Sequence, residues 1–304
     1  MKIKKLTALA LALALLFSLA ACGAPAAEAP VEATEAPAEP TEAPVAAAEE
    51  AAEAVTVRLA ALTGPTAMGM VKMMSDAPDA YNFTIAAAID EITPKLVKGE
   101  VDIAAVPANL ASVLYNNTQG QVRVLAINTL GVLYIVENGD TVHSVEDLRG
   151  RTIYASGKGA TPEYALNYLL SASGIDPQND VNIEYKSEHT ECLAALVATE
   201  GAVAMLPQPF VTTAQMNQPT VRIALDMNEE WARLQEGNEQ KSALITGVVV
   251  ARTEFIDAHP QVVSDFMDAY AASVAYVNEN VDLAAALIGK FDIIPEAVAK
   301  IALP

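Results

Sequence analysis

The sequence predicts an α/β fold of mostly parallel sheets flanked by helices. From Val55 onward, segments typical of strands alternate with segments typical of helices. The strand segments are nearly continuous apolar runs, such as VDIAAV at 101–106 and LITGVVVA at 244–251. Runs of this kind belong to strands that are buried on both faces, as in parallel sheets covered by helices.

The first half of this region starts with a strand and a short turn. We expect strands over 55–62, 82–89 and 101–106, with helices over 68–74, 90–99 and 107–117. Pro107 suits the first turn of its helix, because a proline there removes no hydrogen bond that the helix needs. The apolar stretch 121–136 is expected to form two strands, with a break near Thr129 and Gly131.

The second half repeats the alternation. We expect strands over 151–156, 181–186, 202–206, 220–226 and 244–251, and helices over 162–173, 188–200 and 207–218. Gly174 and Gly201 follow two of these helices at the position where glycine commonly ends a helix. From Glu254 to the end the pattern is helical.

The N-terminus has the features of a secretory signal. Three lysines within the first five residues precede an apolar stretch that ends in small residues before Cys22, so residues 1–21 are predicted to be a signal peptide. The junction LAACG at 19–23 resembles the bacterial lipobox, which implies lipidation of Cys22 and an extracytoplasmic chain anchored to the cell membrane. An ordinary cleaved signal and an uncleaved anchor helix are the alternatives.

Residues 22–54 are predicted to be a disordered tether behind that cysteine. They contain eight glutamates, many alanines and prolines, and no basic or aromatic residue, so they cannot form a core. The remaining 250 residues carry 15 basic and 30 acidic side chains, a net charge of −15. That balance argues against nucleic acid and against electrostatic docking on anionic lipid.

Three predicted strand-to-helix turns share one chemistry. They are TGPT at 63–66, PAN at 107–109 and GKGAT at 157–161. In open α/β sheets ligands bind beyond the carboxyl ends of the strands, where backbone N–H groups at helix starts suit an anion. Hydroxyl and amide side chains add donors, and Lys158 adds a full charge. The same residue types also serve ordinary turns and caps.

The region from about residue 55 to the end resembles the substrate-binding proteins of ABC importers. The matching stretches are DEITPKLVKGEVDIAAVPANLASVLYNN, the run from SVEDLRG to VNIEY, and LAALVATEGAVAMLPQPFVTTA. The resemblance is to the branch that binds nitrate, sulfonates, taurine and thiamine precursors. It implies the two-lobed type 2 periplasmic-binding-protein fold, with two crossover strands as the hinge.

The resemblance also implies the domain organisation and the partners. Lobe one is expected to comprise 55–128 plus 247–304, and lobe two 129–245. A small polar or anionic organic ligand is expected in the cleft between them, for delivery to an ABC permease with its ATPase. We expect a monomer without a cofactor or a metal. Members of the family usually continue for another helix past the point that matches Pro304, which leaves open whether the natural chain is longer.

The ligand-binding positions follow from the resemblance by position in the chain. They are Thr63, Gly64, Thr66, Asn109, Thr129, Lys158, Gly159, Thr161 and Gln208. Relatives often have Glu-Pro where this chain has Gln208-Pro209, so a ligand with an amine is disfavoured. Among the aromatic residues, Tyr164 and Phe210 are the better candidates to line the cleft.

Alternatives for the chemistry remain. His189 and Cys192 lie three residues apart on a predicted helix and are able to reach one metal ion, although helix capping and core packing explain them better. No motif of a hydrolase nucleophile, zinc protease or phosphate-binding loop is present in the sequence. An enzyme on the same fold, similar to menaquinone-pathway lyases, and a ligand-sensing surface lipoprotein are the competing functions.

Overall fold

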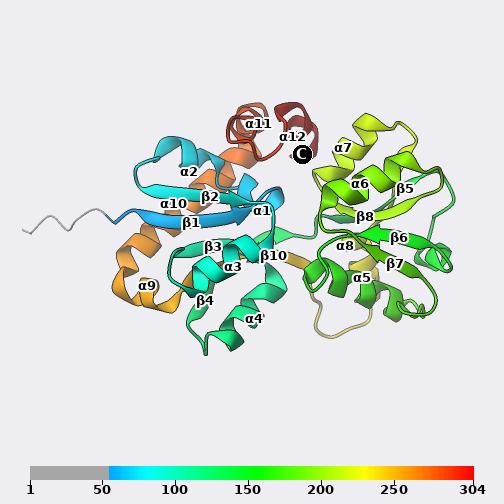
Figure 1. Cartoon of the computed structure of the whole chain (residues 1–304), viewed down its shortest axis with the longest axis horizontal. Helices are drawn as coiled ribbons and strands as arrows, with labels where there is room; N and C mark the ends of the chain where they lie inside the picture. The colour runs from blue at the N-terminus through cyan, green and yellow to red at the C-terminus, as the bar shows by residue number, and fades with distance from the viewer. Residues whose placement is uncertain (1–54) are drawn as a thin grey trace, which may run out of the picture. The chain divides into compact units, whose positions relative to one another are not determined.

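The computed structural model describes residues 55–304, which fold around two five-stranded sheets (Figure 1). The sheet nearer to the N-terminus and the helices packed on it form the first lobe. Its elements are β1 (Val57–Leu62), α1 (Pro65–Met68), α2 (Val71–Asp76), β2 (Tyr81–Ala86), α3 (Ile89–Val97), β3 (Ile103–Pro107), α4 (Ala108–Asn117), β4 (Val122–Leu130), β10 (Ile245–Arg252), α9 (Thr253–Ala258), α10 (Pro260–Glu279), α11 (Val281–Lys290) and α12 (Glu296–Ala302).

The second lobe is built from the chain between β4 and β10. Its elements are β5 (Leu133–Asn138), the short 3₁₀ helix η1 (Val145–Leu148), β6 (Thr152–Ala155), α5 (Thr161–Ala172), β7 (Asn182–Tyr185), α6 (His189–Ala198), β8 (Val203–Pro207), α7 (Phe210–Asn217), β9 (Val221–Asp226) and α8 (Met227–Leu234).

Both sheets have the same pattern of strand directions. The first has the order β2-β1-β3-β10-β4, in which β10 is antiparallel to both of its neighbours and the other strands share one direction. The second has the order β7-β6-β8-β5-β9, in which β5 is the reversed strand. In each lobe the reversed strand is the one by which the chain enters from the other lobe. The predicted fold, mostly parallel sheets flanked by helices, is confirmed.

Each sheet of the structure is covered by helices on both faces, because successive strand residues point to opposite sides. In the first lobe, Leu59, Ile103 and Val249 belong to a core with residues of α2, α10 and α11. Their neighbours Ala60 and Val250 belong to a second core with residues of α3 and α4. In the second lobe one core includes residues of α5 and α8, and the other residues of α6 and α7.

One helix of the second lobe was not expected from the sequence. The sequence predicts no helix or strand over 227–243, but α8 begins there at Met227. The Asp226 carboxylate caps this helix by accepting hydrogen bonds from the backbone N–H of Asn228 and Glu229, at 2.7 and 3.4 Å. An aspartate in this position supplies the acceptor that the first turn of a helix lacks.

The helices of residues 55–304 include none that is both long enough and apolar enough to cross a membrane.

A buried carboxylate joins three strands of the first lobe. Asp102 precedes β3 and is only 2% exposed. It accepts hydrogen bonds from Nε of Arg58 in β1 at 2.9 Å and from Nη2 of Arg252 in β10 at 2.9 Å. Burial alone would raise the pKa of Asp102, but the hydrogen bonds from the two arginines outweigh it and hold the pKa below its usual value.

We expect Asp102→Asn to lower the free energy of unfolding by about 3 kcal/mol or more, because an amide cannot accept all of these bonds and removes the buried charge that Arg58 and Arg252 share. The matched control is Asp257→Asn, which removes an exposed ion pair with Arg123 and should cost about 1 kcal/mol or less. Urea denaturation of both variants measures the difference. Equal losses would contradict the assignment of Asp102 as the tie between these strands.

Candidate functional site

A cavity of about 510 Å³ lies between the two lobes, at the carboxyl ends of their parallel strands. We call it the interlobe cavity. The first lobe lines it with Leu62, Thr63, Ala87, Ala88, Ile89, Asp90 and Pro107. The second lobe lines it with Ser156, Gly157, Lys158, Ala160, Pro162, Lys186, Ser187, Glu188, His189, Thr190 and Phe210. This is the edge at which α/β sheets bind ligands, because loops there lead into helix N-termini.

Two lysines from the second lobe line the interlobe cavity. Lys186 is paired with Glu184, and its ammonium lies 5.3 Å from the centre of the Tyr154 ring. The Lys158 ammonium lies 5.7 Å from the centre of the Tyr185 ring, and it makes no ion pair with any residue in 55–304. Lys158 is therefore the cation of this cavity whose charge is not already matched by a neighbouring carboxylate.

The three turns that the sequence singled out converge in the structure. Thr63, Pro107 and Lys158 all line the interlobe cavity. The Thr63 backbone N–H donates to the Ala86 carbonyl at 2.8 Å, which ties the end of β1 to the end of β2. The loops after β1, β3 and β6 thus meet from opposite lobes around one space.

Asn109 and Thr161 join the lobes at the rim of this space. The Asn109 backbone N–H donates to Oγ1 of Thr161 at 3.2 Å, and the Thr161 hydroxyl donates to Oδ1 of Asn109 at 3.1 Å. The Asn109 amide also donates to the Gly159 carbonyl at 2.9 Å. We call this set of bonds the Asn109–Thr161 latch. Three of the predicted ligand-binding residues, Asn109, Gly159 and Thr161, thus form hydrogen bonds with one another.

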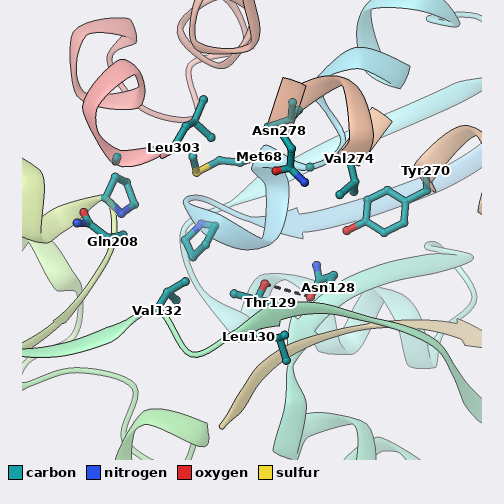
Figure 2. A pocket seen from close by; sticks show the side chains of 15 residues that line it. Met68, Asn128, Thr129, Leu130, Val132, Gln208, Tyr270, Val274, Asn278 and Leu303 are labelled. Atoms are coloured by element: carbon teal, nitrogen blue, oxygen red, sulfur yellow. Dashed lines mark hydrogen bonds between the residues drawn. The ribbon is translucent and has the colours of Figure 1, made fainter. Parts of the chain in front are cut away.

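Two further predicted residues, Thr129 and Gln208, lie at a second cavity of about 220 Å³ beside the crossing strands. Figure 2 shows this hinge pocket, with Met68, Tyr270 and Leu303 among the labelled side chains around it. The Thr129 hydroxyl donates to Oδ1 of Asn128 at 3.2 Å. Oε1 of Gln208 accepts from the Thr212 hydroxyl at 2.9 Å. None of the residues that line the hinge pocket is charged.

Gly64 and Thr66 serve the start of α1. Gly64 has a φ of 107°, a backbone conformation that favours glycine, and it precedes the first helical residue. The Thr66 hydroxyl donates to the Leu62 carbonyl at 2.9 Å, and the residue is only 9% exposed. The nine predicted residues therefore divide among the interlobe cavity, the latch, the hinge pocket and this turn, and their contacts with a ligand stay predictions.

Sequence reasoning missed the loop between β7 and α6. The loop supplies Lys186, Ser187 and Glu188 to the interlobe cavity, and the first turn of α6 adds His189 and Thr190. This loop also joins a strand to a helix at the carboxyl edge of a sheet, so the rule used for the other three turns applies to it. The available signal was its position after the strand predicted over 181–186, but it lacks the glycines that drew attention to the other turns.

His189 and Cys192 do not face a common metal site but have separate surroundings. The Ser156 hydroxyl lies 2.5 Å from Nδ1 of His189, and Cys192 is fully buried in the core. Burial lowers the pKa of His189 to about 4 and raises the pKa of Cys192 to about 11. Within residues 55–304, no group of three or more His, Cys, Asp or Glu side chains is placed to hold a metal ion.

Phe210 packs against the His189 ring, with ring centres 4.9 Å apart, whereas Tyr164 is 56% exposed.

We expect Thr161→Val to open the lobes of the unliganded protein, because it removes the hydroxyl that makes two bonds of the latch and keeps the shape of the side chain. Small-angle X-ray scattering should show a larger radius of gyration. The loss in stability should be about 1 kcal/mol for each bond. The control Thr118→Val removes a hydroxyl that bonds to Leu114 within the first lobe, and should leave the radius unchanged. An unchanged radius for Thr161→Val would show that the latch does not hold the lobes together.

Comparisons with solved structures agree with the fold. An ABC transporter protein from Parabacteroides distasonis superposes with a TM-score of 0.64 and 20% identity, over 81% of this chain and 84% of that chain. The aliphatic sulphonate binding protein of Escherichia coli gives a TM-score of 0.64 and 14% identity, over 82% of each chain. The nitrate-binding protein of Synechocystis PCC 6803 gives 0.63 and 14%, over 81% of this chain and 69% of that chain. No curated protein matches the sequence.

A family match extends the comparison to sequence. Residues 73–276 match the family described as "ABC transporter, phosphonate, periplasmic substrate-binding protein". The match covers about two thirds of the chain, including β3, β4 and every strand of the second lobe. With a cavity between two α/β lobes and a sequence match of this extent, the chain belongs to the family of periplasmic substrate-binding proteins of phosphonate ABC transporters.

Proposed function

We propose that the chain captures a small ligand with a phosphonate, sulfonate or similar oxyanion group in the interlobe cavity, for delivery to an ABC permease. The observation that carries this proposal is the position of Lys158. In a chain with a formal net charge of −20, Lys158 lines the interlobe cavity and also an adjoining cavity of about 630 Å³ that holds Tyr185, and its ammonium has no ion-pair partner in residues 55–304. A lysine is a common partner of phosphate-type oxygens.

Neutral donors around Lys158 support the same ligand class. Thr63, Ser156, Ser187 and Thr190 line the cavity with hydroxyl groups. Those of Thr63, Ser156 and Thr190 bond to Ala86, His189 and Glu188, so the Ser187 hydroxyl is the one without a partner in residues 55–304. The ten-residue helix α6 begins there at His189, and its first turn has backbone N–H groups directed along the helix axis. Asp90 and Glu188 also line the cavity, and we expect them to disfavour ligands with more than one anionic group.

Transport rather than catalysis is the function that the family favours. The structural relatives bind sulphonate and nitrate according to their names, and the family name refers to phosphonate. We therefore propose that the ligand leaves the cavity chemically unchanged and that the protein acts as a monomer. The moving parts are the lobes predicted as 55–128 plus 247–304 and 129–245. Mass spectrometry of the ligand after incubation tests this, since a converted ligand would indicate an enzyme.

We expect methylphosphonate or a short alkanesulfonate to raise the melting temperature of the wild type. At about 100 times its dissociation constant a ligand adds roughly 2.7 kcal/mol to the stability of the folded state. Lys158→Ala should remove most of this shift, because the ammonium is the cation of the cavity without a matching carboxylate in residues 55–304. Lys241→Ala, on an exposed loop outside the cavity, is the control and should keep the shift.

Two results of the melting-temperature experiment would contradict the proposal. If phosphonates, sulfonates, nitrate and inorganic phosphate all leave the melting temperature unchanged, the cavity does not serve anion capture. If Lys158→Ala keeps the wild-type shift, the bound anion lies elsewhere, and the hinge pocket becomes the next place to examine.

We further propose that residues 1–21 are a signal peptide and that Cys22 is lipidated, with 23–54 as the tether. These residues lie outside the part that the structure describes. In a bacterial host, labelled palmitate should be incorporated into the wild type and into Cys192→Ser, whose cysteine is buried, but not into Cys22→Ser. Label on the Cys22→Ser protein would contradict the anchor.

A further inference from the structure

Another cavity, of about 420 Å³, adjoins the interlobe cavity. The two cavities meet at three residues that line both of them, Thr63, Thr190 and Phe210. The other residues that line the second of these cavities are mostly apolar; they are Leu193, Pro209, Thr213, Asp292, Ile293, Ile294 and Pro295. We call this cavity the side pocket. Its volume lies within the range of about 300–1,000 Å³ that is usual for small-molecule sites.

Both lobes build the side pocket. The second lobe supplies Leu193 of α6 and Phe210 of α7, two partly buried side chains that pack on a core of that lobe. The first lobe supplies the loop between α11 and α12, where Ile293 is only 2% exposed and Ile294 packs on the same core. The Ile293 backbone N–H donates to the Ile288 carbonyl at 3.1 Å, which ties the loop to the end of α11. The apolar walls on both sides are therefore anchored in the cores of the lobes.

The hydroxyl groups of the side pocket already donate to acceptors of the protein. Those of Thr63, Thr190 and Thr213 donate to the Ala86 carbonyl, to Oε2 of Glu188 and to the Pro209 carbonyl, at 3.2, 3.1 and 3.2 Å. The charged residue of the lining is Asp292, whose side chain is exposed. An exposed carboxylate stays hydrated, and its charge disfavours a second anionic group nearby. The side pocket therefore suits an uncharged, apolar group.

Phe210 lies at the border between the two cavities and reaches toward the first lobe. A Cβ atom at Gly64 would lie 4.0 Å from Cε2 of the Phe210 ring, so the ring is next to the turn that begins α1. A chain that extends from the interlobe cavity into the side pocket passes this aromatic surface. An alkyl chain gains contact there without removing a polar group from water.

We propose that the side pocket receives an apolar substituent of the bound anion, so that the preferred ligand carries an alkyl or aryl group longer than methyl on its phosphonate or sulfonate. The inference rests on the proposed function, because it takes the interlobe cavity as the anion site. The occupant is part of the same ligand molecule, because the side pocket adjoins that cavity through Thr63, Thr190 and Phe210. Affinity should then grow with each methylene group that leaves water.

Calorimetric titration of the wild type with methylphosphonate and butylphosphonate tests the side pocket. Each methylene group that enters an apolar site should tighten binding about threefold or more, so the three that butylphosphonate adds should give about thirtyfold or more. Equal affinities for the two probes would overturn the inference.

A third probe, 3-aminopropylphosphonate, has as many non-hydrogen atoms as butylphosphonate. It should bind more weakly than butylphosphonate, because an ammonium group loses its hydration in an apolar pocket. Tighter binding of the amine would show that the Asp292 carboxylate selects a cationic group, and would overturn the apolar assignment.

Ile294→Asn should reduce the preference for the longer chain, because it places an amide in the wall that the first lobe supplies. The ratio of the two dissociation constants should fall to about threefold or less. The matched control is Leu283→Asn, which makes a similar change at an exposed position of α11 outside the side pocket and should keep the wild-type ratio. A wild-type ratio in Ile294→Asn would show that the chain lies elsewhere.

Nuclear magnetic resonance of the wild type locates the chain without any variant. With the isoleucine methyl groups labelled, the butyl group of bound butylphosphonate should give nuclear Overhauser contacts to Ile293 or Ile294. Contacts to neither of them would overturn the inference.

Failure of the proposed function gives a different result. If the wild type binds neither phosphonate, the proposed function fails and the role of the side pocket fails with it. If methylphosphonate binds, Lys158→Ala abolishes this binding and butylphosphonate gains nothing over methylphosphonate, the anion site stands and the side pocket is not part of it.

Discussion

The antiparallel pairing of β4 with β10 is the constraint on which the site depends. The pairing runs along nearly the whole of both strands, from Leu130 opposite Ile245 to Val122 opposite Arg252. The chain leaves the first sheet at the end of β4 and returns at the start of β10. Both crossings therefore lie at the carboxyl edge of the parallel strands, and the strand that follows each crossing must run away from that edge. As a result the carboxyl edges of the two sheets face the same space, where the interlobe cavity lies.

The two buried carboxylates that pair with arginines, Asp102 and Glu137, lie away from the interlobe cavity. Asp102 precedes β3, whose other end carries Pro107 at the cavity. Glu137 is fully buried near the far end of β5, where it accepts from Nη2 of Arg222 at 2.8 Å. Each lobe thus has one buried carboxylate bound to arginine at the edge opposite the cavity. The cations that line the cavity are Lys158 and Lys186, and no arginine of residues 55–304 lines it.

The sequence predicted the architecture well because burial on both faces leaves a plain signal. The runs that became β3, β8 and β10 are apolar almost throughout, and Gly174 follows the end of α5 as predicted. Helix α6 ends earlier than predicted, at Ala198, and Gly201 lies three residues beyond it. Helix α8 did have an apolar signal, because Met227, Trp231 and Leu234 follow the i, i+4, i+7 spacing of one helix face and pack on the core of the second lobe. It escaped because the segment is short and its other residues are mostly polar.

The site was predictable only in part, for a physical reason. Strand direction and the position of turns are local properties, so Thr63 and Lys158 could be assigned to the edge where they now line the cavity. The partner of a side chain depends on which other segment folds against it. Nothing local to Asn109 indicates that Thr161, 52 residues later, takes its hydrogen bonds. The same holds for Ser156 and His189, which meet only because β6 and α6 pack together.

The Asn109–Thr161 latch consists of amide, hydroxyl and carbonyl groups without a formal charge. Dissolved ions screen interactions between exposed charges over a Debye length of about 10 Å at 0.1 M salt, but they act little on neutral hydrogen bonds. The contact between the two lobes and the attraction of an anion to the cavity therefore depend differently on ionic strength. A high salt concentration should therefore slow the binding of an anionic ligand without weakening the latch.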